Sequence, residues 1–111
     1  ASRDAARWLR CRSCGHPLAR TADRFAMAGQ GLTASFVNPG GFVHEVLTTR
    51  NAPGCLPVGA PVRADTWFPG YTWRFALCGR CTGFVGWAYD AVSALDPVRF
   101  WGLRSAAVRE D

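Results

Sequence analysis

Four of the five cysteines in this 111-residue chain form two C-x-x-C pairs, at positions 11/14 and 78/81. A two-residue spacer lets a tight turn present both sulfurs of a pair to one metal ion, and Zn²⁺ prefers four thiolates in a closed tetrahedral site. Glycine, which tolerates the positive φ that such turns often need, directly follows one cysteine of each pair, at positions 15 and 79. The pattern predicts one Zn²⁺ ion bound by Cys11, Cys14, Cys78 and Cys81.

The two cysteine pairs lie far apart in the sequence, because residues 15–77 separate them. In a zinc finger both pairs flank one small unit, whereas here the ion would join the start of the chain to its last third. Closing a disulfide loop of comparable length removes about 4 kcal/mol of unfolded-state entropy, so we interpret the zinc as structural. A thioredoxin-like redox pair and disulfide bonds are the alternatives for these cysteines.

The fifth cysteine, Cys55, lies in a Pro- and Gly-rich segment that predicts a loop. A catalytic cysteine needs a nearby base, and His16 and His44 are the two histidines of the chain. His16 follows a cysteine pair, and His44 lies in an alternating run that predicts a polar strand position. The sequence therefore predicts a free thiol at Cys55 and no catalytic triad.

Composition narrows the class of protein. Hydrophobic residues make up 49% of the chain and charged residues 19%, which excludes intrinsic disorder. No apolar run reaches the roughly 20 residues that span a bilayer or has the length of a signal-peptide core. The 12 Gly and 7 Pro are scattered and disfavour long helices. We expect one all-β domain over residues 1–111, cytoplasmic and without a membrane partner.

The basic residues are all arginine, 13 of them, and with 8 acidic residues they give a formal net charge of +5. They are spread along the chain, whereas nucleic-acid-binding modules usually concentrate basic residues on one face or along one helix. We therefore expect no nucleic-acid partner. A zinc-ribbon-like nucleic-acid binder stays the alternative.

Short β-type runs separated by Gly and Pro predict seven strands. Residues 38–41 have the composition of a hairpin turn, and residues 68–71 carry Pro and Gly at the central positions of a type II turn. Residues 95–97 mark a third break. The predicted strands are residues 24–27, 32–37, 42–49, 62–64, 73–78, 84–92 and 100–103.

Three tryptophans are expected to converge. Side chains along a strand alternate between its two faces, and the second cysteine pair joins the strands at 73–78 and 84–92, which makes these strands antiparallel neighbours. The turn at 68–71 folds Trp67 back toward them. One face of each strand is predicted to carry Trp73, Phe75 and Leu77 on the first strand and Val85, Trp87 and Tyr89 on the second.

This aromatic group predicts a binding cage rather than a packed core. Each buried indole N–H needs a hydrogen-bond partner, so small cores favour aliphatic residues. Trp67 and Tyr71 also border a Pro-Gly turn, which is a surface element. Such a cage suits a flat ring or a small cation. A packed aromatic core is the alternative.

An ordered set of motifs resembles the CULT, or cereblon-type thalidomide-binding, domain family. The resemblance covers most of the chain, from about residue 11 to residue 104, and the composition, without Lys and rich in Arg, Ala and Gly, resembles the stand-alone bacterial members. The motifs are the segment Asn38-Pro-Gly-Gly-Phe-Val-His-Glu-Val-Leu-Thr, the segment Trp67-Phe-Pro-Gly-Tyr-Thr-Trp73, the pair Cys78-x-x-Cys81, the dipeptide Gly86-Trp87 and the segment Phe100-Trp-Gly-Leu103.

The resemblance implies a β-tent, in which two antiparallel sheets meet at roughly right angles and are pinned by the four-cysteine zinc site. It implies a binding module for cyclic imides: the glutarimide of thalidomide analogues, uracil-type rings, or C-terminal cyclic imides of damaged proteins. Backbone groups at Asp65 and Trp67 would bind the imide. The implied ligand-binding residues are the cage walls Trp67, Trp73 and Trp87, with Tyr89 and Asp65 beside them and Asn38 and Pro39 at the mouth.

Two positions depart from the vertebrate pattern of that family: Asp65 stands where His is usual, and Tyr89 where Phe is usual. An ionised Asp accepts hydrogen bonds but donates none, so we expect weaker affinity than in vertebrate members. We expect no enzyme activity, no ubiquitin-ligase role and no cullin-adaptor partner. The enzyme alternative, a methionine sulfoxide reductase of the B type, needs a reactive cysteine on a late strand, and no cysteine follows Cys81.

Overall fold

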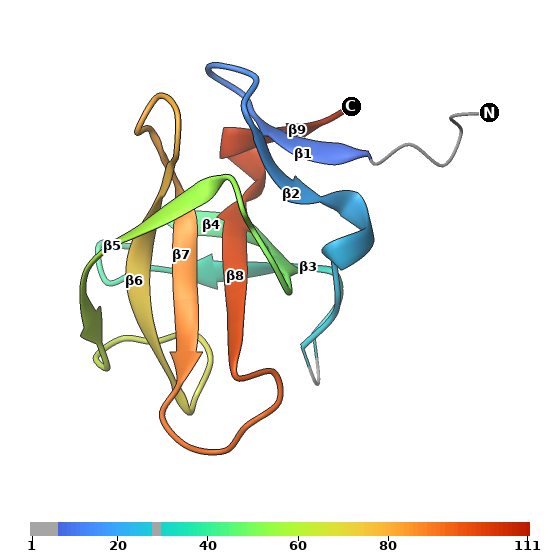
Figure 1. Ribbon diagram of the computed structural model, residues 1–111. Helices are drawn as coiled ribbons and strands as arrows, with labels where there is room; N and C mark the ends of the chain where they lie inside the picture. The colour runs from blue at the N-terminus through green and yellow to red at the C-terminus, as the bar shows by residue number, and fades with distance from the viewer. Residues whose placement is uncertain (1–6, 28–29) are drawn as a thin grey trace.

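The computed structural model describes residues 7–27 and 30–111, which form nine β-strands and two short 3₁₀ turns without an α-helix (Figure 1). No helix in this part of the chain is long and apolar enough to cross a membrane. The prediction of an all-β fold with two antiparallel sheets is confirmed. The strands are β1 (Trp8–Cys11), β2 (Pro17–Arg20), β3 (Thr33–Val37), β4 (Val43–Thr49), β5 (Cys55–Val62), β6 (Tyr71–Cys78), β7 (Phe84–Ala91), β8 (Arg99–Arg104) and β9 (Val108–Glu110).

The smaller sheet has the order β2-β1-β9 and lies beyond one end of β8 (Figure 1). Residues of β1 alternate between the core and the surface, with Leu9 and Cys11 buried. The sequence pattern predicts none of these three strands. Strands of three or four residues contain at most two inward positions, which is too short a run for alternation to stand out.

The larger sheet has the order β3-β4-β8-β7-β6-β5, with all neighbours antiparallel. The middle of strand β7, residues 85–89, is buried. Glycines allow β7 and β8 to approach closely, because a Cβ on Gly86 would lie 2.1 Å from the Gly102 carbonyl oxygen. Two of the predicted strands are wrong, and so is the predicted loop around Cys55. Within residues 24–27 only Arg24 pairs, in an isolated bridge to Thr49. Of residues 62–64 only Val62 lies in a strand, because the strand there covers residues 55–62 and includes Cys55.

Prolines explain the error at β5. Pro57 and Pro61 lie within this strand, and proline cannot donate a hydrogen bond to a neighbouring strand. β5 is one of the two edge strands of the larger sheet, where proline is tolerated because one side of the strand has no partner in the sheet.

Both predicted turns are present. Gly41 has φ 86° and its N–H donates to the Asn38 carbonyl oxygen at 2.9 Å, closing the β3–β4 hairpin. The Tyr71 N–H donates to the Phe68 carbonyl oxygen at 3.1 Å, and Gly70 has φ 90°, as the third position of a type II turn requires. These two turns hold residues 38–41 and 67–71 beside the large sheet.

The core divides into two clusters. One surrounds the cysteines, and the other is aromatic and includes Tyr89, Phe100 and Trp87. The prediction that Val85 shares a face with Trp87 is wrong, because β7 contains a β-bulge. Gly86 pairs with Ala76 and Phe84 pairs with Leu77, so Val85 is the extra residue between them. Val85 therefore packs into the cysteine cluster rather than beside Trp87.

Candidate functional site

Four sulfur atoms from two distant segments lie together. All four Sγ atoms of Cys11, Cys14, Cys78 and Cys81 are within 4.8 Å of one another, with Cys11 3.7 Å from Cys81 and Cys14 3.6 Å from Cys78. Tetrahedral thiolates bound at about 2.3 Å from one ion would have sulfurs about 3.8 Å apart. The cluster can hold one metal ion, and it joins the end of β1 in the small sheet to the end of β6 in the large sheet.

The two cysteine turns have the same backbone geometry. In each, the N–H of the residue after the second cysteine donates to the carbonyl of the first: Gly15 to Cys11 at 2.8 Å and Thr82 to Cys78 at 2.9 Å. Both of these residues have positive φ, 80° and 62°. The predicted role of Gly79 is therefore wrong, because Thr82 takes the left-handed position. Gly79 serves close packing instead, since a Cβ there would lie 2.8 Å from the Gly54 carbonyl oxygen.

The turn at residues 78–81 also stabilises the thiolate form of Cys78. Burial raises the pKa of Cys78, but backbone N–H groups of Cys81 and Arg80 and the Cys14 thiol stabilise its thiolate and bring the pKa down to about 7. Thiolates are the form in which cysteine binds metal. None of the five cysteines forms a disulfide in this structure, and all five lie within its described residues.

Cys55 lies outside the four-sulfur group although it packs in the same core cluster. Burial, followed by the neighbouring Cys78 and Cys11, raises the pKa of Cys55 to about 12. The thiol is therefore protonated at neutral pH and is a poor nucleophile.

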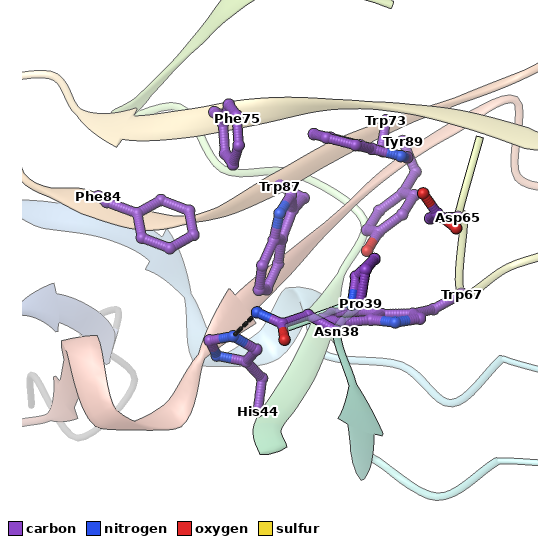
Figure 2. Close-up of a pocket in the computed structure, with 10 residues that line it drawn as sticks. All are labelled: Asn38, Pro39, His44, Asp65, Trp67, Trp73, Phe75, Phe84, Trp87 and Tyr89. Carbon is purple, nitrogen blue, oxygen red and sulfur yellow. Dashed lines mark hydrogen bonds between the residues drawn. The ribbon is translucent and has the colours of Figure 1, made fainter. Parts of the chain in front are cut away.

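A cavity of about 370 Å³ opens beside β6 and β7 (Figure 2). The structure brings all seven residues proposed for ligand binding to its wall: Asn38, Pro39, Asp65, Trp67, Trp73, Trp87 and Tyr89. Three further lining residues, His44, Phe75 and Phe84, were not proposed from the sequence.

Strand register positions the cage. Trp73 on β6 pairs with Tyr89 on β7, and Phe75 pairs with Trp87, so the four aromatic side chains share one face of the sheet. Figure 2 shows Trp73 and Trp67 on opposite sides of the cavity, with Trp87 between them. The alternation predicted for Trp73, Trp87 and Tyr89 is present in the structure.

Backbone carbonyls fix two of the three indoles. The Trp67 Nε1–H donates to the Val37 carbonyl oxygen at 3.1 Å, and the Trp73 Nε1–H donates to the Ala64 carbonyl oxygen at 2.7 Å. Trp67 also stacks on Phe36, with ring centroids 5.0 Å apart and planes 10° apart. These contacts hold both ring planes in place and leave their apolar faces to the cavity.

His44 completes the wall between Trp67 and Trp87. Its ring is edge-on to Trp87, with centroids 5.3 Å apart, and its Nε2 lies 3.3 Å from the Asn38 Nδ2. Burial, followed by the positive charge of Arg104, lowers the pKa of His44, so the neutral ring accepts a hydrogen bond from Asn38 at physiological pH. The alternating sequence around His44 indicates only a polar strand position, because it is the tertiary packing of β4 that brings this side chain to the cage.

The loop before Trp67 carries unpaired backbone groups. Asp65 is exposed at the cavity edge and adopts φ 58°, an uncommon conformation for a non-glycine residue. Within the described residues, neither the Asp65 carbonyl oxygen nor the Trp67 backbone N–H has a backbone partner. One acceptor and one donor are therefore left without a backbone partner beside the indoles.

No protein-family model matches the chain. Curated proteins named cereblon do: 42% identity over 85 residues for Danio rerio, covering 76% of this chain and 20% of that protein, and 38% over 103 residues for Xenopus tropicalis, covering 91% and 23%. Drosophila pseudoobscura cereblon is 40% identical over 104 residues, covering 89% and 17%. The chain is a cereblon-like domain.

The cereblon-like domain spans 17% to 23% of the length of these relatives. A solved structure, the crystal structure of the Mis18 "Yippee-like" domain, superposes with a TM-score of 0.63 and 14% identity, covering 96% of this chain and 95% of that one. At this identity, the likeness concerns the fold alone.

Proposed function

We propose that this cereblon-like domain binds small cyclic imides in the cage formed by Trp67, Trp73 and Trp87. The observation that carries the proposal is the combination of three indole walls with an unpaired backbone acceptor and donor at one edge. The ligand classes are glutarimide rings, uracil-type rings and the C-terminal cyclic imides of damaged proteins.

The walls match the faces of such rings. Because the Trp67 and Trp73 N–H groups already donate to backbone carbonyls, these indoles offer apolar surfaces without a desolvation penalty. A small imide has apolar CH₂ or C–H groups on its faces, which suit flat aromatic walls.

The edge matches the polar side of the ring. An imide presents one N–H donor between two carbonyl acceptors. The free Asp65 carbonyl oxygen would accept from the imide N–H, and the free Trp67 backbone N–H would donate to an imide carbonyl. The Asp65 carboxylate cannot replace a donating side chain, so the backbone provides this part of recognition.

We propose that the metal of the cysteine cluster is Zn²⁺ and that it is structural. The sulfur separations of 3.6 and 3.7 Å suit four thiolates around one tetrahedral ion. With all four positions taken by protein sulfur, such an ion has no site for a reactive water. The metal would hold the two sheets together rather than act on the ligand.

We propose a binding module rather than an enzyme. The Cys55 thiol is buried and protonated, and the cavity lining contains one carboxylate and one histidine, which do not form a catalytic pair in the structure. The expectation of no cullin-adaptor and no membrane partner forms part of this proposal, as does a cytoplasmic location.

The test is a fluorescence titration of glutarimide against N-methylglutarimide, which lacks the imide donor. We expect micromolar binding of glutarimide, about 7 to 8 kcal/mol, and much weaker binding of the methylated ring. Equal binding of both rings, or tight binding of tetramethylammonium instead, would contradict the proposal. Binding of an oligonucleotide that weakens steeply with salt would favour the nucleic-acid alternative.

A further inference from the structure

The floor of the cage contains a hydroxyl group that the protein itself does not use. Tyr89 is only 1% exposed, yet it lines the cavity, and Figure 2 shows its hydroxyl oxygen on the side of Pro39 and Trp67. None of the side-chain hydrogen bonds within the described residues involves this hydroxyl. Its oxygen is also not one of the fully buried polar atoms without a partner, as expected for an atom that borders the cavity. By contrast, the Tyr71 hydroxyl in the same aromatic cluster donates to the Pro97 carbonyl oxygen at 2.7 Å.

Packing fixes the position of the Tyr89 ring. It stacks on Phe100, with centroids 4.8 Å apart and planes 14° apart, and meets Phe68 edge to face at 4.9 Å. A Cβ on Gly102 would lie 3.0 Å from its Cε2 atom, so the ring has no room to shift toward β8. The hydroxyl is therefore preorganised at one point of the cavity wall.

Its protonation state is also fixed. Burial raises the pKa of Tyr89 well above its ordinary value, so the group is a neutral phenol that both donates and accepts a hydrogen bond. A ligand that covers this hydroxyl with a CH₂ group leaves it without a partner, and a buried polar group without a partner weakens binding.

We propose that the Tyr89 hydroxyl makes the cage selective, among small cyclic imides, for rings with a second hydrogen-bonding ring atom. This inference rests on the proposed function. Dihydrouracil carries a ring N–H where glutarimide has CH₂, and the two rings otherwise have nearly the same shape. Because the imide edge is nearly symmetric, dihydrouracil can enter in either of two orientations and direct its extra N–H toward Tyr89.

The experiment measures the dissociation constants of glutarimide and dihydrouracil for the unmodified protein, Tyr89→Phe and Tyr71→Phe. We expect the unmodified protein to prefer dihydrouracil by about tenfold, and Tyr89→Phe to bring the ratio of the two dissociation constants to about one. Tyr71→Phe is the matched control, since it removes a hydroxyl outside the cavity, and it should retain the preference. Metal content and thermal unfolding verify that each variant is folded.

The outcomes separate the two proposals. If glutarimide binds but the unmodified protein shows no preference for dihydrouracil, the role of Tyr89 is refuted and the imide-binding function stands. The same holds if Tyr89→Phe keeps the preference, or if Tyr71→Phe abolishes it. If neither ring binds, both proposals fail. If Tyr89→Phe does not fold, equal binding of the two rings by the unmodified protein still refutes the role of Tyr89.

Discussion

Cys55 on β5 lies directly opposite Cys78 on β6, so a fifth thiol packs beside the four-cysteine cluster without belonging to it. The Gly79 N–H donates to the Gly54 carbonyl oxygen at 2.8 Å next to this pair, which holds β5 against the second cysteine turn. A sulfur this close to a metal site raises the question of whether it serves as a substitute ligand.

We predict that Cys55→Ala keeps one metal ion per chain and lowers the free energy of unfolding by only about 1 kcal/mol, the usual cost of a small core truncation. The thiol has a pKa of about 12 and stays protonated, which makes it a poor ligand. Elemental analysis and thermal unfolding measure both quantities. Loss of the metal from this variant would mean that Cys55 is a ligand after all.

Removal of the metal should unfold the protein. Cys11 is 2% exposed and, with Cys14 in the turn that follows β1, provides the small-sheet half of the cluster. Cys11→Ser or a strong chelator should therefore disconnect the two sheets. We expect loss of the near-ultraviolet circular dichroism signal and recovery on addition of Zn²⁺. A chelated protein that keeps its native spectrum and melting temperature would show that the cluster is dispensable.

Trp73→Ala should weaken imide binding by about ten- to hundredfold, because it removes one wall of the cage. Trp73 is only partly buried, so the melting temperature should change little. Trp87 is a poorer choice for this test: it is 7% exposed, and truncation of a core aromatic costs about 3–5 kcal/mol. Trp8→Ala in the small sheet serves as the control and should bind normally. If Trp73→Ala lowers the melting temperature but the folded variant binds the imide with unchanged affinity, the tryptophans serve only the packing of the core.

Acidification should destabilise the cage through His44. The pKa of His44 is lowered from 6.5 in the folded state, so the unfolded chain takes up a proton at a higher pH than the folded protein does. The contribution of His44 to stability is therefore fully present above pH 6.5 and is lost as the pH falls through the pKa of the folded state. Protonation also removes the acceptor for Asn38. We expect imide affinity and melting temperature to decline from about pH 7 to about pH 5.

His44→Gln should flatten that dependence while leaving the cysteine cluster, which has its own response to acid, unchanged. The difference between the pH profiles of His44→Gln and the unmodified protein gives the contribution of His44 to the acid response. Parallel profiles for the variant and the unmodified protein would assign the acid response to other groups.

Binding should leave the imide ring intact. Among residues 7–27 and 30–111, Asp65 is the only carboxylate on the cavity wall, and it is exposed to solvent, so it is a weak candidate for a general base. Mass spectrometry of a hydrolysable glutarimide incubated with stoichiometric protein should show ring opening no faster than in buffer. Faster opening that disappears in Asp65→Asn would make the protein an enzyme.

The features that the sequence predicts correctly depend on local chemistry. The cysteine spacing and the Pro-Gly turns depend on neighbours in the sequence, so the four-sulfur group and the turn at residues 68–71 could be predicted before any tertiary contact was known. The alternation of Trp73 and Phe75 likewise needs only a strand.

The errors arose where tertiary packing decides. β5 forms despite two prolines, because it is an edge strand, and Phe84 faces the cage because of a bulge that no local pattern indicates. His44 becomes a wall of the cavity only when β4 and β7 are joined through β8. Each of these features depends on which strands become neighbours, and that information is not local.

The pairing of β1 with β9 has a consequence for how the chain acquires its structure. Seven other strands separate these two partners along the sequence, so the small sheet has a high contact order, and the search for such distant partners slows folding. On a ribosome, Leu9 and Cys11 have no β-partner on the β9 side until residues 108–110 have been synthesised. Until then, one side of β1 is an unpaired strand edge, which is a site for aggregation. Binding of a chaperone, or early binding of a metal ion by Cys11 and Cys14, would protect the nascent chain.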